Sequence, residues 1–333
     1  MKNNKPLASL SLDLDNLWSY MKTHGDSGWE SFPSYLDIVV PRVLDFLERR
    51  GLKITFFVVG QDAALQKNYA TIRSIADAGH EIGNHSFNHE PWLHLYSEQQ
   101  IEAELSKTEE HLERVTGQKT IGFRGPGYSL SLAVLRVLTR RGYYYDASTL
   151  PTFLGPLARA YYFMTTKLSP EEKENRKLLF GQLRDGLRSL HPYRWHIDGL
   201  SEKLLEIPVT TMPIFKIPFH ISYILYLYRF SPILARTYFR LAMVLCKLTH
   251  TQPSLLLHPL DFLGGDDIKE LSFFPAMNLP GEEKVKLVSD ILSIYSDYYT
   301  IVPMSEHARA LYNEKDMTAV EPKFRSVTIH PQL

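Results

Sequence analysis

The chain has 333 residues, 44% of them hydrophobic, which is enough to bury a large core. Lys and Arg together number 37, as do Asp and Glu, and this balance argues against wholesale nucleic-acid binding, which favours a basic domain. The single cysteine, Cys246, rules out an internal disulfide framework and fits a reducing compartment. The N-terminus lacks the apolar segment of a signal peptide, and no run of about 18 uncharged apolar residues occurs, so we expect neither a signal peptide nor a spanning helix.

The first half of the chain alternates between segments that predict strands and segments that predict helices. Apolar runs predict strands at 7–14, 53–59, 81–84, 120–124 and 143–146. Helical patterns, most of them followed by a glycine, occupy 35–50, 62–78, 97–116 and 131–141. This alternation predicts parallel strands joined by crossover helices. We therefore expect a single α/β domain over residues 1–313.

Two stretches interrupt the alternation and are predicted to be insertions. Residues 151–204 mix charged and aromatic residues with little strand signal, and we expect them to be helical. Residues 210–252 form the second insertion. The remaining pattern predicts strands at 204–209, 254–257 and 299–302, and helices at 282–298 and from Ser305. The polar residues 314–333 are expected to form a loosely held tail.

Residues that can carry chemistry follow several predicted strands. Asp13 and Asp15 end the first strand, His85 follows the third, Arg124 the fourth and Asp146 the fifth. In folds built from parallel strands, ligands bind at the carboxyl ends of the strands. We therefore expect these side chains to gather at one edge of the sheet.

His85 and His89 are candidate metal ligands. Their spacing of four residues, if they lie in the first turn of a helix, places both imidazoles on one side, where they can hold one ion. A hydrolytic metal site commonly adds a carboxylate and leaves positions for water and substrate. Asp15 or Asp13 is the best third ligand, and the other carboxylate can then act as a base. The alternatives are that the histidines are surface or capping residues and that the aspartates form a turn.

His258 and Arg124 are candidates for supporting roles. His258 follows three leucines, so the strand is buried and its imidazole emerges at the end, where it suits a general acid. Arg124 can bind a carboxylate bidentately, and the Gly-Pro-Gly turn after it can present a backbone N–H to an oxyanion. The alternatives are a capped core histidine and a surface arginine.

In this order, the clusters resemble the motifs of the polysaccharide deacetylase family, the metal-dependent amidohydrolases built on the NodB-homology domain. Residues 11–16, Ser-Leu-Asp-Leu-Asp-Asn, look like an Asp-x-Asp variant of the first motif, which implies that Asp13 is the base and Asp15 a metal ligand. The second motif, His-Ser/Thr-x-x-His, is matched by His85 to His89, which implies that both histidines bind the metal.

The resemblance also assigns the oxyanion turn and the acid. Arg124-Gly-Pro is similar to the family's Arg-x-Pro-aromatic motif, but Gly127 intervenes before Tyr128, so the implied oxyanion amide is Gly127, with Tyr128 beside it in the substrate pocket. The Leu-x-x-His motif is matched by residues 255–258, which implies that Leu255 lines the pocket for the acetyl methyl and that His258 is the acid.

The fourth motif of the family, which contains Asp and Trp, has two candidates here, Asp146 and Trp195. The resemblance as a whole covers residues 7 to about 301 and implies a distorted (β/α)7-type barrel with helical insertions and a divalent metal, usually Zn²⁺.

The implied activity is metal-dependent hydrolysis of an N-acyl amide, acetyl or formyl, on an amino sugar. One alternative is an amidohydrolase that acts on a small non-sugar amide or a cyclic imide. Another is a non-catalytic barrel that binds a glycan, but a pure binder has no use for an acid, a base and a metal site together.

Residues 207–260 contain no Asp or Glu but carry several basic residues. A helix is expected to begin at Ser231-Pro232, and within it Arg236, Arg240 and Lys247 form one stripe, with the apolar residues on the opposite faces. We expect residues 214–249 either to lie on an anionic membrane surface or to pack on the barrel with a solvated basic edge.

The lack of an export signal argues against extracellular chitin or peptidoglycan as the substrate. We therefore expect a cytoplasmic protein, peripheral on the inner face of the cell membrane, whose substrate is an N-acyl amino sugar linked to a polyprenyl phosphate or carried by a glycolipid precursor.

Overall fold

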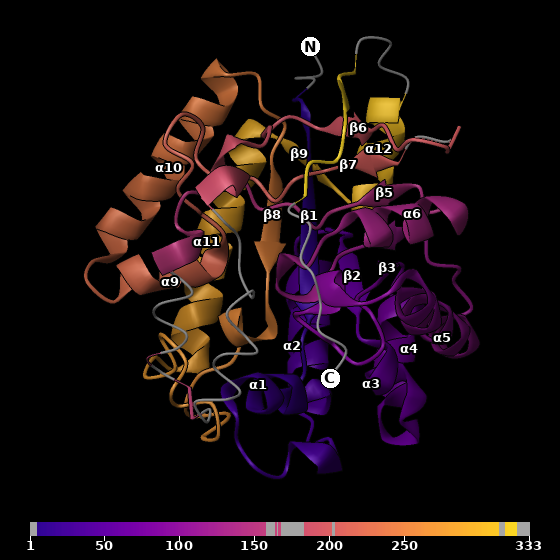
Figure 1. Ribbon diagram of the computed structural model, residues 1–333. Helices are drawn as coiled ribbons and strands as arrows, with labels where there is room; N and C mark the ends of the chain where they lie inside the picture. Colours follow the sequence, from indigo (N-terminus) through magenta and orange to yellow (C-terminus); the bar gives the residue numbers. More distant parts are fainter. Residues whose placement is uncertain are drawn as a thin grey trace.

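The computed structural model describes residues 5–157, 164, 166–167, 183–201, 204–312 and 317–324. In these ranges the strands form one curled sheet with helices around its outer face (Figure 1). The strand order is β10-β6-β7-β5-β4-β3-β2-β1-β8, and β9 also pairs with β1. All of these pairs are parallel except β6 with β7. The α/β fold with a distorted barrel is therefore confirmed.

The strands are short apart from the first. They are β1 Leu7–Leu14, β2 Thr55–Val58, β3 Glu81–Asn84, β4 Gly122–Phe123, β5 Tyr145–Asp146, β6 Tyr193–Trp195, β7 Leu205–Glu206, β8 Ser254–Leu257, β9 Thr300–Val302 and β10 Ala319–Val320. The central position of β1 explains its length, because it pairs with three other strands and presents both faces to buried surroundings.

The helices are α1 Leu17–His24, α2 Leu36–Glu48, α3 Gly60–Ala64, α4 Tyr69–Asp77, α5 Glu98–Thr116, α6 Leu132–Arg140, α9 Ile221–Tyr228, α10 Pro232–Leu248, α11 Gly281–Tyr298 and α12 Met304–Tyr312. Of these, α1 and α9 were not predicted from the sequence. Local signals set the ends of α5, where Ser97 and Gln100 form a capping box and Gly117 closes the helix in a left-handed conformation. The single helix expected at 62–78 is wrong, because Leu65 is extended and separates α3 from α4.

The predicted insertion at 151–204 is only partly described, since residues 158–163, 165, 168–182 and 202–203 lie outside the described ranges. Its described part contains β6, which the sequence did not predict. The tail expected at 314–333 is described only at 317–324, and this part packs on the sheet rather than being loosely held. β10 pairs with β6, and the Phe324 ring lies 6.1 Å from that of Trp195.

The sheet has two buried faces that differ in chemistry. Alternate residues of a strand point to opposite sides, and on β1 the residues Leu10 and Leu12 join the large apolar core beneath the helices. Ser9, Ser11 and Asp13 therefore face the other side, the interior of the curled sheet. All three are buried, so the interior carries the polar groups of the fold.

Helix α12 fills this interior at the end where the strands begin. Met304, Ala308 and Leu311 pack against Phe57 and Tyr145 from the sheet. His307 from the same helix lies at hydrogen-bond distance from the Ser9 hydroxyl, 3.1 Å, and from the Gln252 amide oxygen, 3.0 Å. The interior is thus filled at the end where the strands begin, which leaves the carboxyl ends of the strands as the place for a functional site.

Because three histidines are buried, we expect acid to lower the stability of the folded protein. Burial lowers the pKa of His307 to about 4, burial and the charge of Lys53 lower that of His80 to about 4, and burial with the charges of His258 and Arg124 lowers that of His220 to about 3. In the unfolded chain a histidine titrates near pH 6.5. Below that pH these histidines are protonated in the unfolded state but stay neutral in the folded state. The free energy of unfolding therefore falls by up to ~1.4 kcal/mol per pH unit for each histidine.

Urea unfolding at pH 7.5, 6.0 and 5.0 measures this slope. The variant His307→Gln is expected to be less stable at pH 7.5 and to show a shallower decline toward pH 5.0, because one of the three groups is gone. An unchanged slope in the variant would show that His307 does not contribute.

Candidate active site

Asp15, His85 and His89 converge just beyond the ends of β1 and β3. The Asp15 Oδ1 atom lies 2.9 Å from His89 Nε2 and 3.3 Å from His85 Nε2. Burial favours a raised pKa for Asp15, but the two imidazoles outweigh it and hold the pKa well below its usual value. Asp15 is therefore an anion aimed at two ring nitrogens.

A network of buried polar contacts fixes the position of Asp15. Asn16 caps α1, with its Oδ1 accepting from the Leu17 N–H at 2.8 Å. The Tyr35 hydroxyl donates to the Asp15 carbonyl at 2.6 Å, and the Asn16 amide donates to Asp62 Oδ1 at 2.7 Å. Because its backbone is held from two sides, the carboxylate needs little reorganisation to act as a ligand.

The loop that carries the two histidines is not a helix, so the helical spacing assumed for them is wrong. Ser86 and His89 both have positive φ, 57° and 50°. Glu104 of α5 holds the loop by accepting from the backbone N–H groups of Phe87 and Asn88, both at 2.9 Å. Although the loop is not helical, it turns the chain so that both imidazoles face the same carboxylate.

The three side chains fit a divalent metal. Their ligand atoms all lie within 4.8 Å of one another. His85 donates its Nδ1–H to the Arg124 carbonyl at 2.6 Å, which leaves the Nε2 lone pair facing Asp15. His89 Nδ1 is buried without a hydrogen-bond partner. Two imidazoles and one carboxylate form a donor set that suits Zn²⁺ and similar ions.

Arg124 and Asp13 form the second pair of the site. Arg124 is fully buried, which excludes the surface-arginine alternative. Its Nη1 donates to Asp13 Oδ1 at 2.7 Å and to the Ser11 hydroxyl at 2.9 Å, and its Nε donates to the Ala147 carbonyl at 3.0 Å. The expected bidentate contact is therefore wrong, since one nitrogen serves both Asp13 and Ser11. The guanidinium also lies over the Phe57 ring, 4.4 Å from its centre.

His258 emerges beside Asp13. β1 and β8 are parallel with Leu12 opposite Leu257, so Asp13 and His258 are the next pair along the two strands. Adjacent strands lie about 4.8 Å apart, which puts the two side chains on the same face at neighbouring positions. The described geometry thus joins a carboxylate, an imidazole and the Asp–His–His cluster at one edge of the sheet.

Comparisons with known proteins bear on this arrangement. Residues 26–145 match the sequence model of a family described as Polysaccharide deacetylase. The chain carries a polysaccharide deacetylase domain. A peptidoglycan deacetylase of Helicobacter pylori is 25% identical over 203 residues, 58% of this chain and 67% of that protein. A peptidoglycan-N-acetylmuramic acid deacetylase of Bacillus subtilis is 38% identical over 104 residues, but the match spans only 31% of this chain and 38% of that protein.

Two solved structures share the fold of this deacetylase domain. A Mycobacterium smegmatis protein described as a polysaccharide deacetylase has a TM-score of 0.60 at 21% identity, and the match covers 100% of this chain and 97% of that one. Puue Allantoinase has a TM-score of 0.56 at 15% identity and covers 96% and 94%. At these identities the likeness concerns the fold alone.

The family resemblance expected from the motifs is therefore confirmed, and with it the class of hydrolases that act on amide bonds. The matched range contains His85, His89 and Arg124, while Asp13 and Asp15 precede it and His258 follows it. Family deacetylases depend on a divalent metal, and the Asp–His–His cluster is the candidate site for it in this domain.

The deacetylase domain holds His258 through contacts that the sequence did not predict. Asp261 Oδ2 accepts from the backbone N–H of His258 at 2.7 Å. Ser222 of α9 donates to Asp261 Oδ1 at 3.1 Å, and its hydroxyl also lies 3.4 Å from His258 Nδ1. The hydroxyl therefore links the imidazole to a buried carboxylate, which orients the ring.

Helix α9 also brings His220 to the site. The rings of His220 and His258 lie 6.0 Å apart, and His220 Nδ1 is buried without a hydrogen-bond partner. Its strongly lowered pKa keeps it neutral beside His258 and Arg124. His220 and Ser222 come from the predicted insertion at 210–252, where the only hint in the sequence was a histidine and a serine just before and within an aromatic helix.

Leu255 is not where the motif placed it. Leu255 and Leu257 belong to the core beneath the helices, on the face opposite Asp13. Leu256 instead pairs with Ser11 and shares the inward face with Asp13 and His258. Leu256 is thus the leucine of β8 that can border the active site.

The turn predicted to bind the oxyanion contains Gly127 and Tyr128. Gly127 is exposed with φ 57° in a short turn, and Tyr128 follows it with φ 60°. Burial and Asp13 raise the pKa of Tyr128, which places its ring in the electrostatic reach of the base. The role of Gly127 as the oxyanion donor stays a prediction.

Asp146 and Trp195 meet at Glu206 and are not part of the Asp–His–His cluster. The indole N–H of Trp195 donates to Glu206 Oε2 at 2.9 Å. Burial and the neighbouring Asp146 raise the pKa of Glu206 well above its usual value, so the two carboxyls share a proton. Asp146 in turn accepts from Ser148, whose hydroxyl accepts from the Gly125 N–H at 2.8 Å. The pair therefore supports the turn after Arg124.

The variant Ser222→Ala tests the link from His258 to Asp261. We expect kcat to fall about tenfold with KM nearly unchanged, because the imidazole loses the hydroxyl that orients it for proton transfer. Ser231→Ala, which removes the cap of the next helix without touching His258, is the control. If both variants keep the kcat of the wild type, the hydroxyl plays no part in the reaction.

Proposed function

We propose that the domain removes an N-acyl group, acetyl or formyl, from an amino sugar with the help of a bound divalent metal, Zn²⁺ by preference. The observation that supports this most directly is the placement of Asp13, Arg124 and His258 around the Asp–His–His cluster. A cation held by Asp15, His85 and His89 would lower the pKa of water and polarise an amide carbonyl when bound.

The side chains divide the remaining work. Asp13, oriented by its 2.7 Å contact with Arg124, accepts the proton of the attacking water. His258, supported by Ser222 and Asp261, donates a proton to the departing nitrogen. The turn at Gly127 is proposed to donate a backbone N–H to the oxyanion that forms between these two steps.

We further propose that the substrate is linked to a lipid and that residues 214–249 contact the membrane that carries it, on its inner face. Seventeen large apolar side chains are exposed in the described part of the chain, and ten of them lie between residues 214 and 248. No helix in the described ranges is long and apolar enough to cross a membrane. The exposed apolar cluster supports contact at the membrane surface.

The helix that carries the cluster differs from the predicted one. The apolar residues expected opposite the basic stripe differ in their exposure, because Met243 is buried while Leu241 and Val244 are exposed. Arg236 is not free, since its guanidinium pairs with Asp290 of α11 at 2.6 Å. α10 lies outside α11 at the left edge of the molecule (Figure 1), so its exposed face is open for contact along its length.

Incubation of a bacterial lipid extract with the metal-loaded wild type and with Asp13→Asn tests the activity. We expect mass spectrometry to show a lipid-linked amino sugar that has lost an acetyl or formyl group only with the wild type. If soluble N-acetyl-sugar oligomers lose the group and no lipid does, deacetylation stands and the lipid-linked substrate is wrong.

A further inference from the structure

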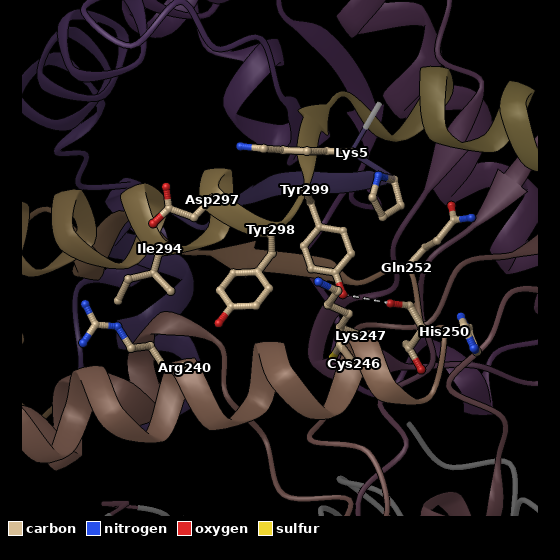
Figure 2. A pocket seen from close by; sticks show the side chains of 12 residues that line it. Lys5, Arg240, Cys246, Lys247, His250, Gln252, Ile294, Asp297, Tyr298 and Tyr299 are labelled. Atoms are coloured by element: carbon tan, nitrogen blue, oxygen red, sulfur yellow. Dashed lines mark hydrogen bonds between the residues drawn. The ribbon is translucent and has the colours of Figure 1, made fainter. Parts of the chain in front are cut away.

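We propose that an open groove between α10 and α11 binds the headgroup of an anionic phospholipid. The groove has a volume of about 810 Å³ and lies where β1 and β8 begin, so it is at the opposite end of the strands from the active site. Its walls include Lys5, Arg240 and Lys247, with Tyr298 and Tyr299 between them (Figure 2). The proposal rests on the proposed membrane contact and not on the chemistry of the active site.

The charges in the groove favour an anion. Lys5, Arg240 and Lys247 are cationic at neutral pH, and Asp297 is the single carboxylate among the residues that line the groove. Arg240 and Lys247 have no carboxylate within ion-pair distance among the described residues, whereas Arg236 on the same helix is paired. The two cations are therefore available to a ligand.

Two of these cations also interact with the C-terminal ends of helices. Lys5 Nζ donates to the Ser296 carbonyl in the last turn of α11 at 2.6 Å, and Lys247 lies in the last turn of α10, where a cation suits the helix dipole. These contacts account for Lys5 and in part for Lys247. They do not account for Arg240, which lies in the middle of α10.

The position of the cations on α10 indicates that the ligand comes from a membrane. With 3.6 residues per turn, Arg240 and Lys247 lie within about 20° of each other around the helix, and Val244, Leu248 and Leu241 follow over the next ~100°. The exposed fraction of Leu248 is 70% and that of Leu241 is 48%. A helix that buries this apolar side in the acyl region holds its basic edge, and the groove beside it, at the level of the phosphates.

The groove has the polar and apolar surfaces that such a headgroup requires. The Tyr299 hydroxyl donates to the Thr251 carbonyl at 3.3 Å, which fixes that ring in the wall. Ile294 and Cys246 form an apolar part of the lining. A phosphate can lie on Arg240 and Lys247 while the glycerol contacts the tyrosines and the acyl chains continue toward Val244 and Leu248.

Vesicle flotation of the full chain tests the proposal. We expect the wild type to bind vesicles of phosphatidylcholine with phosphatidylglycerol about 30-fold more tightly than vesicles of phosphatidylcholine alone, the size of effect that two basic residues give at an anionic surface. Arg240→Gln with Lys247→Gln should abolish this preference and leave the weak binding to neutral vesicles. The control, Lys107→Gln with Lys119→Gln, removes two charges from α5 and the turn after it and should keep the preference.

A soluble probe separates the groove from general surface charge. Dihexanoyl-phosphatidylglycerol below its micelle concentration is expected to raise the Tm of the wild type and the control, but not that of the Arg240/Lys247 variant. No shift with the wild type would show that the groove does not bind a headgroup, and an equal shift with inorganic phosphate would show that the site takes free phosphate rather than lipid. Because neither measurement uses turnover, failure here leaves the deacetylase activity standing, and loss of that activity leaves this result unchanged.

Discussion

The variant Asp13→Asn is expected to lower kcat/KM by about 10³-fold, within the range found for removal of a positioned base. Asparagine has nearly the same shape as aspartate and can still accept from Arg124 Nη1, but it cannot take a proton. Metal affinity should stay near that of the wild type, because Asp13 is not among the three side chains whose ligand atoms converge. The measurement pairs acyl release from the substrate with the metal content after dialysis.

The same change also removes the anion that neutralises a buried cation. Arg124 is fully buried, and Asp13 is its only carboxylate partner in the described part of the chain. A partner lost from such a pair costs a few kcal/mol when the charge is left unmatched. Ser11→Ala, which removes a neutral partner of the same Arg124 nitrogen, serves as the control for altered packing around the guanidinium. An Asp13→Asn protein that folds, binds metal and keeps full activity would exclude Asp13 as the base.

The sequence was sufficient for most of the fold because the signals there are local. β1 alternates polar residues with leucine from Ser9 to Leu14, and α5 begins after a serine cap and ends before a glycine, so each element can be recognised from its own residues. β6 and β10 have only three and two residues and lie at the edge of the sheet. The pairing of β6 with β10 joins segments more than a hundred residues apart, and no local pattern records it.

The same difference between local and long-range signals explains which residues of the active site could be predicted. Asp13 lies near the end of β1, and Asp15, His85 and Arg124 directly follow strands, so the alternation of the chain is enough to bring them together. Ser222 and His220 were missed because they meet His258 only through the packing of α9, which belongs to no repeating unit of the barrel. Asp261 was missed although it lies only three residues after His258 and accepts from its backbone N–H.

The assignment of Leu255 was wrong for a different reason. Residues 255 to 257 are all leucine, so their chemistry does not show which of them faces inward. The pairing of Ser11 with Leu256 decides the question, and that register is a property of the assembled sheet.

Loss of metal binding is the second large effect that we expect. His89→Ala removes the ring whose Nε2 lies 2.9 Å from Asp15 Oδ1 and leaves one imidazole and one carboxylate, a set too small to hold Zn²⁺ firmly. We expect at least a 100-fold rise in the dissociation constant for Zn²⁺, measured by competition with a chromophoric chelator, and loss of activity at stoichiometric metal.

A thermal measurement checks this without any substrate. A ligand that binds only the folded state at 100 times its dissociation constant stabilises it by about 2.7 kcal/mol, so Zn²⁺ should raise the Tm of the wild type by several degrees. The shift should vanish in His89→Ala and remain in His191→Ala, which removes an exposed imidazole outside the cluster. Asp13→Asn should also keep the shift while losing activity, because it removes the base and leaves the ligands in place. If His89→Ala keeps both the shift and the activity, the metal is held elsewhere and the division of roles between the two aspartates is wrong.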